Sequence, residues 1–293
     1  MRVLLLIIAL CTLGALPAWA ADILILQANR NASYNEVLQG FQLSGKTTAR
    51  TVVISDYAEV DITRLVKETR PRLILTVGDS ALNAVSMVQN IPIVAVMTLG
   101  LHNIKYAQQN LTGISMFTSP ELYVSLFKSM KLRRIGVVYN DTRSEWYLRQ
   151  ALDAARQAGI EMVVRKVTSP SAVADRLTSM KGTVDAVWML PDTTAVTRET
   201  SEAYFRFGLE NAVPVIAFSA NYLGLGAAAV YDIDRPALGR QAAAMTAAIL
   251  EGTKGTGTPF DYPRSVVLKS NPPVLKRLNL PTSLESSNHQ PDR

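Results

Sequence analysis

Short apolar runs alternate with amphipathic stretches along most of the chain. Most of the runs are apolar at every position, which is typical of parallel strands covered by helices on both faces. The expected strands span residues 22–27, 51–55, 72–78, 92–97, 134–140, 161–165, 185–191, 214–219, 227–232 and 265–269. The expected helices span residues 33–43, 61–69, 80–89, 144–158, 171–180, 197–210 and 235–250. This alternation indicates βαβ units and an α/β fold with doubly wound parallel sheets.

A segment rich in Gly, Asn, Gln and Thr, residues 99–120, separates two sets of four strand–helix units. We interpret the sets as two similar doubly wound parallel-sheet lobes joined by a hinge. The elements after residue 225 are too few for a third domain, so we assign them back to the lobes. The expected division is residues 21–116 plus 226–253 for lobe 1, residues 117–225 plus 254–281 for lobe 2, and a disordered polar tail at 282–293.

The first twenty residues predict export. Arg2 precedes an apolar run, and Ala18-Trp19-Ala20 gives the small-x-small pattern of a signal-peptidase site, so we expect cleavage before Ala21. The run is shorter than the roughly 20 residues that a membrane span needs. Cys11 follows Leu10 and not a small residue, so lipid attachment is not expected. We therefore expect a periplasmic protein whose mature chain has no cysteine.

The charge balance excludes few partners but does not favour nucleic acid. The formal net charge is +6, from 30 Lys and Arg against 24 Asp and Glu. No basic stripe is interleaved with aromatic residues, as a nucleic-acid surface requires. We expect a monomer that binds no nucleic acid.

Two glycine motifs resemble nucleotide-binding loops but stand in the wrong context. Residues 40–47 match the phosphate-loop pattern, yet they leave a helix and precede a strand. Residues 224–229 resemble a dinucleotide fingerprint but also precede a strand. Both motifs bind phosphates only where a strand ends and a helix begins, so we expect plain turns at both places.

Catalytic chemistry is not apparent in the sequence. The only histidines are His102 and His289, and neither stands beside an evident partner. The chain has no Gly-x-Ser-x-Gly elbow and no cluster with metal-ligand spacing. We expect a binding protein and not an enzyme, with no catalytic residue, no metal and no cofactor.

Ligands of open α/β sheets bind where the strands end and the helices begin. The loops at these ends carry polar and aromatic side chains in both lobes, which suits a small polar ligand held between the lobes. Helix capping and turn formation are alternative roles for the carboxylate, amide and hydroxyl members of the set. The candidate ligand-binding residues are Asn29, Tyr34, Asp79, Ser80, Thr98, Asn140, Asp192, Thr193, Ser219, Tyr231 and Asp232.

Four segments together resemble a known family. They are Asn110-Leu111-Thr112-Gly113, residues 134–140, residues 185–194, and the stretch from Val230 to Ala243. In order and spacing they are similar to ABC-transporter substrate-binding proteins of the type I periplasmic-binding fold, in the branch with tryptophan- and tyrosine-binding members. The resemblance covers nearly all of the mature chain. It implies hinge closure around a ligand, commonly an amino acid, and presentation to a membrane permease.

The resemblance also implies that Asp192, Thr193, Asp79 and Ser80 hold the polar ends of the ligand. The loop at Gly78-Asp79-Ser80-Ala81 departs from the Gly-Thr-Pro-Ala of the family, and Thr98-Leu99 stands where Asp-Pro is common. A carboxylate at Asp79 would repel a ligand carboxylate, which favours an amine or several hydroxyls. Two other functions remain open: a sensor that presents its bound state to a membrane receptor, and an exported enzyme on the same fold.

Overall fold

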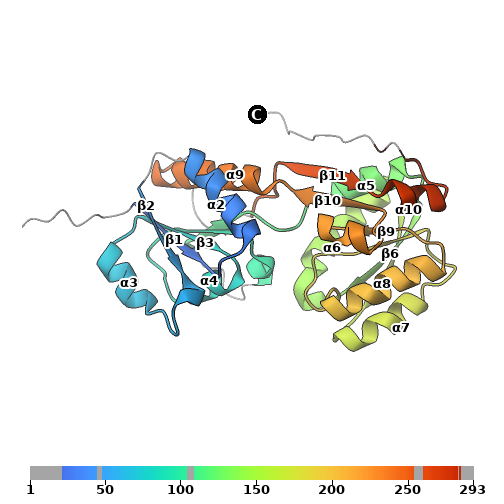
Figure 1. Cartoon of the computed structure of the whole chain (residues 1–293), viewed down its shortest axis with the longest axis horizontal. Coiled ribbons are helices and arrows are strands. Elements are labelled where there is room, and N and C mark those ends of the chain that lie inside the picture. The colour runs from blue at the N-terminus through green and yellow to red at the C-terminus, as the bar shows by residue number, and fades with distance from the viewer. Residues whose placement is uncertain (1–21, 45–47, 104–108, 254–259, 283, 285–293) are drawn as a thin grey trace, which may run out of the picture.

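The computed structural model describes residues 22–44, 48–103, 109–253, 260–282 and 284. Two α/β lobes lie side by side, each built around its own sheet (Figure 1). The expected signal peptide lies outside the described residues, as does most of the polar tail.

The first lobe contains a five-stranded parallel sheet in the order β2-β1-β3-β4-β5. Its strands are β1 (Ile23–Gln27), β2 (Ala49–Val53), β3 (Leu73–Val77), β4 (Ile93–Val96) and β5 (Leu111–Gly113). Helices α2 (Ala32–Ser44) and α9 (Arg235–Leu250) cover one face, and α3 (Ile62–Thr69) and α4 (Asp79–Ala84) cover the other. Ile23 and Ile25 face the first pair and Leu24 and Leu26 the second, so these four positions must all be apolar.

The second lobe contains a six-stranded sheet in the order β11-β10-β9-β8-β6-β7. Its strands are β6 (Arg134–Tyr139), β7 (Glu161–Lys166), β8 (Ala186–Trp188), β9 (Val215–Ala217), β10 (Ala229–Ile233) and β11 (Val266–Ser270). Only the edge strand β11 is antiparallel, paired with β10. Helices α5 (Pro120–Ser129), α6 (Asp141–Gln157) and α10 (Pro272–Arg277) pack on one face, and α7 (Val173–Thr178) and α8 (Arg198–Glu210) on the other.

The two sheets have the same strand connectivity. The parallel strands β7-β6-β8-β9-β10 repeat the order β2-β1-β3-β4-β5 strand for strand. Each sheet therefore has a switch point, between β1 and β3 in the first lobe and between β6 and β8 in the second. The predicted fold class, two similar doubly wound parallel-sheet lobes, is confirmed.

The chain passes between the lobes at three places: after β5, after β10 and after α9. The first and third passages lie together, because Ser115 donates its backbone N–H to the carbonyl of Asp261 at 2.8 Å. Residues 229–233 form β10 and pair with β9, so they belong to the second sheet. The sequence-based division placed 226–253 as a whole in lobe 1, which is wrong for this strand. The run continues the parallel sheet of lobe 2 before the chain crosses to α9.

Three elements lie or begin where the sequence predicted an irregular break at 99–120. A 3-10 helix spans Leu99–Asn103, strand β5 extends the first sheet beyond β4, and α5 starts at Pro120. A three-residue strand that includes Thr112 and Gly113 has too little apolar pattern to detect. The helix expected at 80–89 is shorter and ends at Ala84.

Helices α2 and α9 approach each other through glycines. A Cβ placed on Gly239 would lie 2.0 Å from the carbonyl oxygen of Val37, and one on Gly40 would lie 2.0 Å from that of Pro236. Both distances are far below van der Waals contact, so only glycine allows this packing. Gly40, the first glycine of the phosphate-loop pattern, therefore serves helix packing.

Candidate ligand site

The two switch points bring polar loops to the carboxyl edges of both sheets. In the first lobe this edge holds the chain after β1 and the start of α4. In the second it holds the start of α6 and the loop after β8. Ligands of sheets with this strand order bind at these positions.

In the first lobe, Tyr34 lies over the turn after β3. Gly78 adopts φ +95°, and a Cβ there would lie 2.5 Å from the Tyr34 hydroxyl oxygen. Burial, and then the negative charge of Asp79, raise the pKa of Tyr34, so the phenol stays protonated. Asn29 is exposed, and its Oδ1 accepts a 3.0 Å hydrogen bond from Asn31. Tyr34, Gly78 and Asp79 thus form one surface at the first switch point.

Asp79 holds the neighbouring loop. Its carboxylate accepts the backbone N–H of Gly100 at 2.8 Å and that of Leu99 at 3.3 Å. These residues begin the 3-10 helix η2 (Leu99–Asn103), which follows β4. The neighbouring Ser80 is exposed. Asp79 therefore fixes the position of η2 as well as lying at the switch point.

In the second lobe, Asp192 is 1% exposed and accepts four hydrogen bonds. Its Oδ2 accepts the N–H of Asn140 at 2.7 Å and the hydroxyl of Ser144 at 2.5 Å. Its Oδ1 accepts the N–H groups of Thr194 and Ala195, both at 2.9 Å. The carboxylate thus ties the loop after β8 to the start of α6, and the exposed Thr193 lies on the loop that it shapes.

Asn140 is buried, and both ends of its side-chain amide make hydrogen bonds. Its Nδ2 donates to the carbonyl of Val167 at 2.9 Å, and its Oδ1 accepts the hydroxyl of Thr142 at 2.6 Å. Together with Asp192 it forms the rigid base of the second switch point.

Asp232 lies at the passage from β10 to α9. Its carboxylate accepts the N–H of Ala220 at 3.2 Å, and Lys269 Nζ lies 2.8 Å away. Arg235, the first residue of α9, is 3.9 Å from Asp232 and 3.3 Å from Glu36 on α2. This chain of charges joins the second sheet to the helices of the first lobe. Ser219, half-buried, immediately precedes Ala220.

Two predicted residues turn away from this group. Thr98 is 1% exposed, and its hydroxyl donates to the carbonyl of Val96 at 3.1 Å. Tyr231 is 2% exposed and packs edge-on against Tyr123 in the core, with ring centroids 5.2 Å apart. The structure therefore places Asn29, Tyr34, Asp79 and Ser80 at the carboxyl edge of one sheet, and Asn140, Asp192, Thr193, Ser219 and Asp232 at that of the other.

Sequence reasoning missed an aromatic contact between the lobes. The imidazole of His102, on η2, stacks on the indole of Trp146, on α6, with centroids 3.4 Å apart and planes 15° from parallel. His102 Nε2 lies 3.1 Å from the hydroxyl of Ser115. Burial lowers the pKa of His102 to about 4. No local pattern marks Trp146, because it is one aromatic residue on an amphipathic helix.

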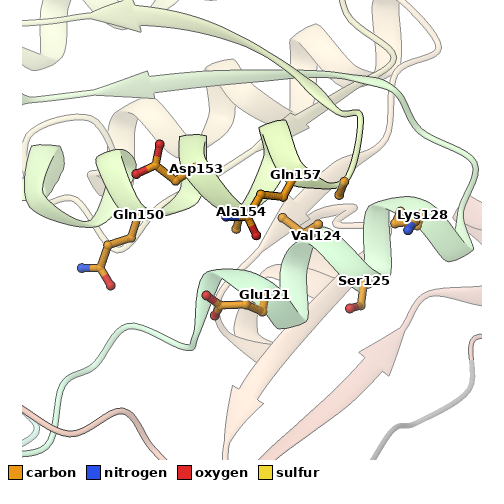
Figure 2. Close-up of a pocket in the computed structure, with 9 residues that line it drawn as sticks. Glu121, Val124, Ser125, Lys128, Gln150, Asp153, Ala154 and Gln157 are labelled. Atoms are coloured by element: carbon orange, nitrogen blue, oxygen red, sulfur yellow. The ribbon is translucent and has the colours of Figure 1, made fainter.

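Two surface grooves lie elsewhere in the second lobe. One, of about 500 Å³, runs between α5 and α6 and is lined by polar side chains such as Glu121, Lys128 and Asp153 (Figure 2). The other, of about 420 Å³, lies between α8, α10 and the 3-10 helix η4 (Ala220–Leu225). Neither groove includes a predicted site residue.

In the part of the chain that the structure describes, no group of three or more His, Cys, Asp or Glu side chains is placed to hold a metal ion. Among the same residues, no helix has both the length and the apolar character needed to cross a bilayer.

Comparison with known proteins agrees with this architecture. Residues 48–287 match the family described as ABC transporter substrate binding protein. The chain belongs to this family of substrate-binding proteins. A tyrosine-binding protein of Clostridioides difficile (strain R20291) is 26% identical over 175 residues. That match covers 58% of the chain and spans about half (50%) of the relative's length.

Two solved structures share the fold. A ligand-free, open substrate-binding protein with adhesive properties from Clostridium difficile superposes with a TM-score of 0.64 at 20% identity. It covers 92% of this chain and 97% of its own. An ABC domain in complex with L-Trp from Streptococcus pneumonia gives a TM-score of 0.61 at 19% identity, covering 90% and 96%. The similarity extends over both lobes, so this chain has the type I periplasmic-binding fold.

Proposed function

We propose that this family member captures an amino acid with an aromatic side chain and presents it to the permease of an ABC importer. The observation that carries the proposal is the repeated strand order, which places one polar switch point in each lobe. Similarity to proteins described as binding L-Trp and tyrosine supports the ligand class. The ligand lies between the carboxyl edges, and closing the lobes buries it.

The hydrogen bonding of Asp79 supports an amino-acid ligand. A free carboxylate at the start of α4 would repel a ligand carboxylate. Both oxygens of Asp79 accept backbone N–H groups of η2, which offset part of its charge. Its remaining negative charge suits the ammonium group of an amino acid.

We also propose that the chain is exported to the periplasm after cleavage before Ala21. The basis is the apolar run and the Ala18-Trp19-Ala20 pattern. Fractionation of cells that express the full chain tests this: we expect a shortened protein in the periplasmic fraction. Full-length protein in the cytoplasm would overturn it.

Calorimetry with the chain from residue 21 onward tests the ligand class. The panel contains L-Trp, L-Tyr, L-Leu, L-Lys, a hexose and a nucleoside. We expect L-Trp or L-Tyr to bind and to raise the Tm, because a ligand at 100 times its Kd stabilises the folded state by about 2.7 kcal/mol. Binding of the hexose or the nucleoside alone would contradict the proposed class.

A further inference from the structure

The stack of His102 on Trp146 lies where the two carboxyl edges meet. His102 belongs to η2, which follows β4 in the first lobe. Trp146 lies in the second turn of α6, whose first turn is fixed by Asp192 through Asn140 and Ser144. Each lobe thus contributes one ring, next to the polar residues that line the candidate site.

The geometry shows that the indole face accepts a flat ring. Aromatic pairs in proteins usually meet offset or edge-on. Here the planes are 15° from parallel at a centroid distance of 3.4 Å, which is full face-to-face contact. Phe117 meets the indole edge-on at 5.0 Å and Phe260 meets the imidazole edge-on at 4.9 Å. The result is a box with a planar floor and aromatic sides.

The two rings are held differently. Trp146 stands on a 17-residue helix and contacts Phe117 and Tyr147, so its position is fixed by the second lobe. Its Nε1 makes no hydrogen bond to any described residue. His102 stands on a five-residue 3-10 helix and has the Ser115 hydroxyl as its hydrogen-bond partner. His102 is therefore the ring that can leave, and Trp146 the one that stays.

The stack involves a neutral imidazole. Because burial keeps the pKa of His102 near 4, the ring is uncharged at neutral pH and contributes as a flat aromatic group. Another neutral planar ring can replace it at the same indole face.

We propose that Trp146 is the platform on which the aromatic side chain of the ligand stacks, and that His102 competes with the ligand for this platform. The inference rests on the proposed function and adds a specificity-determining residue to it. Ligand entry moves His102 off the indole, and the ligand ring takes its place. The platform selects planar side chains over aliphatic ones.

Substitutions of the two rings should change the ligand affinity in opposite directions. Trp146→Ala removes the platform, so we expect L-Trp or L-Tyr to bind at least about tenfold more weakly, while Trp146→Phe restores part of the affinity. His102→Ala removes the competing ring, so we expect about three- to tenfold tighter binding. Arg149→Ala, on the solvent side of the same helix, is the control and should leave the affinity unchanged.

A spectroscopic readout avoids dependence on a folded Trp146 variant. After residue 20 the chain contains only the tryptophans at 146 and 188, so Trp188→Phe leaves Trp146 as the sole indole. We expect L-Tyr to change the emission of Trp146 at saturating concentration and L-Leu to leave it unchanged.

The outcomes separate this inference from the proposed function. Aromatic ligands that bind Trp146→Ala as tightly as the native chain, or leave Trp146 emission unchanged, overturn the platform and leave the function standing. Weaker binding to His102→Ala overturns the replacement of one ring by the other. If only aliphatic or polar solutes bind, the platform fails while solute capture stands. If no solute in the panel binds, both fail.

Discussion

The backbone N–H of Asn140 donates a 2.7 Å hydrogen bond to Oδ2 of the buried Asp192. This bond joins the ends of β6 and β8, the two strands that flank the second switch point. With its three other hydrogen bonds, Asp192 uses its oxygens to shape the protein. Its effect on a ligand therefore passes through the loop that it positions.

Removing this carboxylate should lower both stability and affinity. Asp192→Ala leaves four donors without their acceptor, and we expect a loss of about 2–4 kcal/mol in the free energy of unfolding. We also expect at least about tenfold weaker ligand binding, because the loop loses its anchor. Urea unfolding and calorimetry measure the two effects. Thr193→Ala, an exposed neighbour, should stay within about 0.5 kcal/mol of the native stability. A native unfolding midpoint for Asp192→Ala would refute the bracing role.

Asp79 should control the mobility of η2. Asp79→Ala removes the acceptor of the Leu99 and Gly100 N–H groups, so we expect about 1–2 kcal/mol lower stability. Hydrogen exchange should become faster at those two amides. Ser80→Ala keeps the acceptor and should show native exchange. Equal protection in both variants would show that η2 is held by other contacts.

The buried imidazole predicts a pH dependence of stability. Burial lowers the folded-state pKa of His102 to about 4, below its ordinary value of about 6.5. Between these values the unfolded chain takes up the proton first, so stability is complete above pH 6.5 and falls as the pH drops toward 4. The total loss is at most about 3 kcal/mol. His102→Phe keeps an aromatic ring without the titrating group, so its stability should fall less over this window. Parallel curves for the two proteins would contradict the assignment.

The α2–α9 contact should not tolerate a side chain at Gly239. Alanine favours a helix over glycine by about 1 kcal/mol, yet its Cβ would meet the Val37 carbonyl at 2.0 Å. The clash should dominate, and we expect Gly239→Ala to lose at least about 2 kcal/mol of unfolding free energy. Gly224→Ala meets no atom within 4 Å and is the matched control. A stabilised Gly239→Ala would mean that the helices separate at little cost.

Burial on both faces made most of the fold predictable. Strands such as β4 are buried and apolar at every position, and that pattern is visible in the sequence. Strand β5 escaped detection because three residues carry too little pattern. The assignment of β10 to the wrong lobe has another cause: strand pairing depends on contacts between distant segments.

The sequence predicted which loops form the candidate site, but not the role of each side chain in them. Strand order and strand ends identify the loops that contain Asp79 and Asp192. Whether a carboxylate meets a ligand or a backbone N–H depends on loop geometry, which local sequence does not encode. The stack of His102 on Trp146 could not be predicted either, because it joins residues of two different lobes.

The late passages of the chain between the lobes determine when each lobe is completed during synthesis. Strand β10 completes the parallel part of the second sheet, α9 then covers the first sheet, and β11 returns to the second. The first lobe has all its elements only after Leu250, and the second only after Ser270. A nascent chain of this design lacks a finished unit that can fold early.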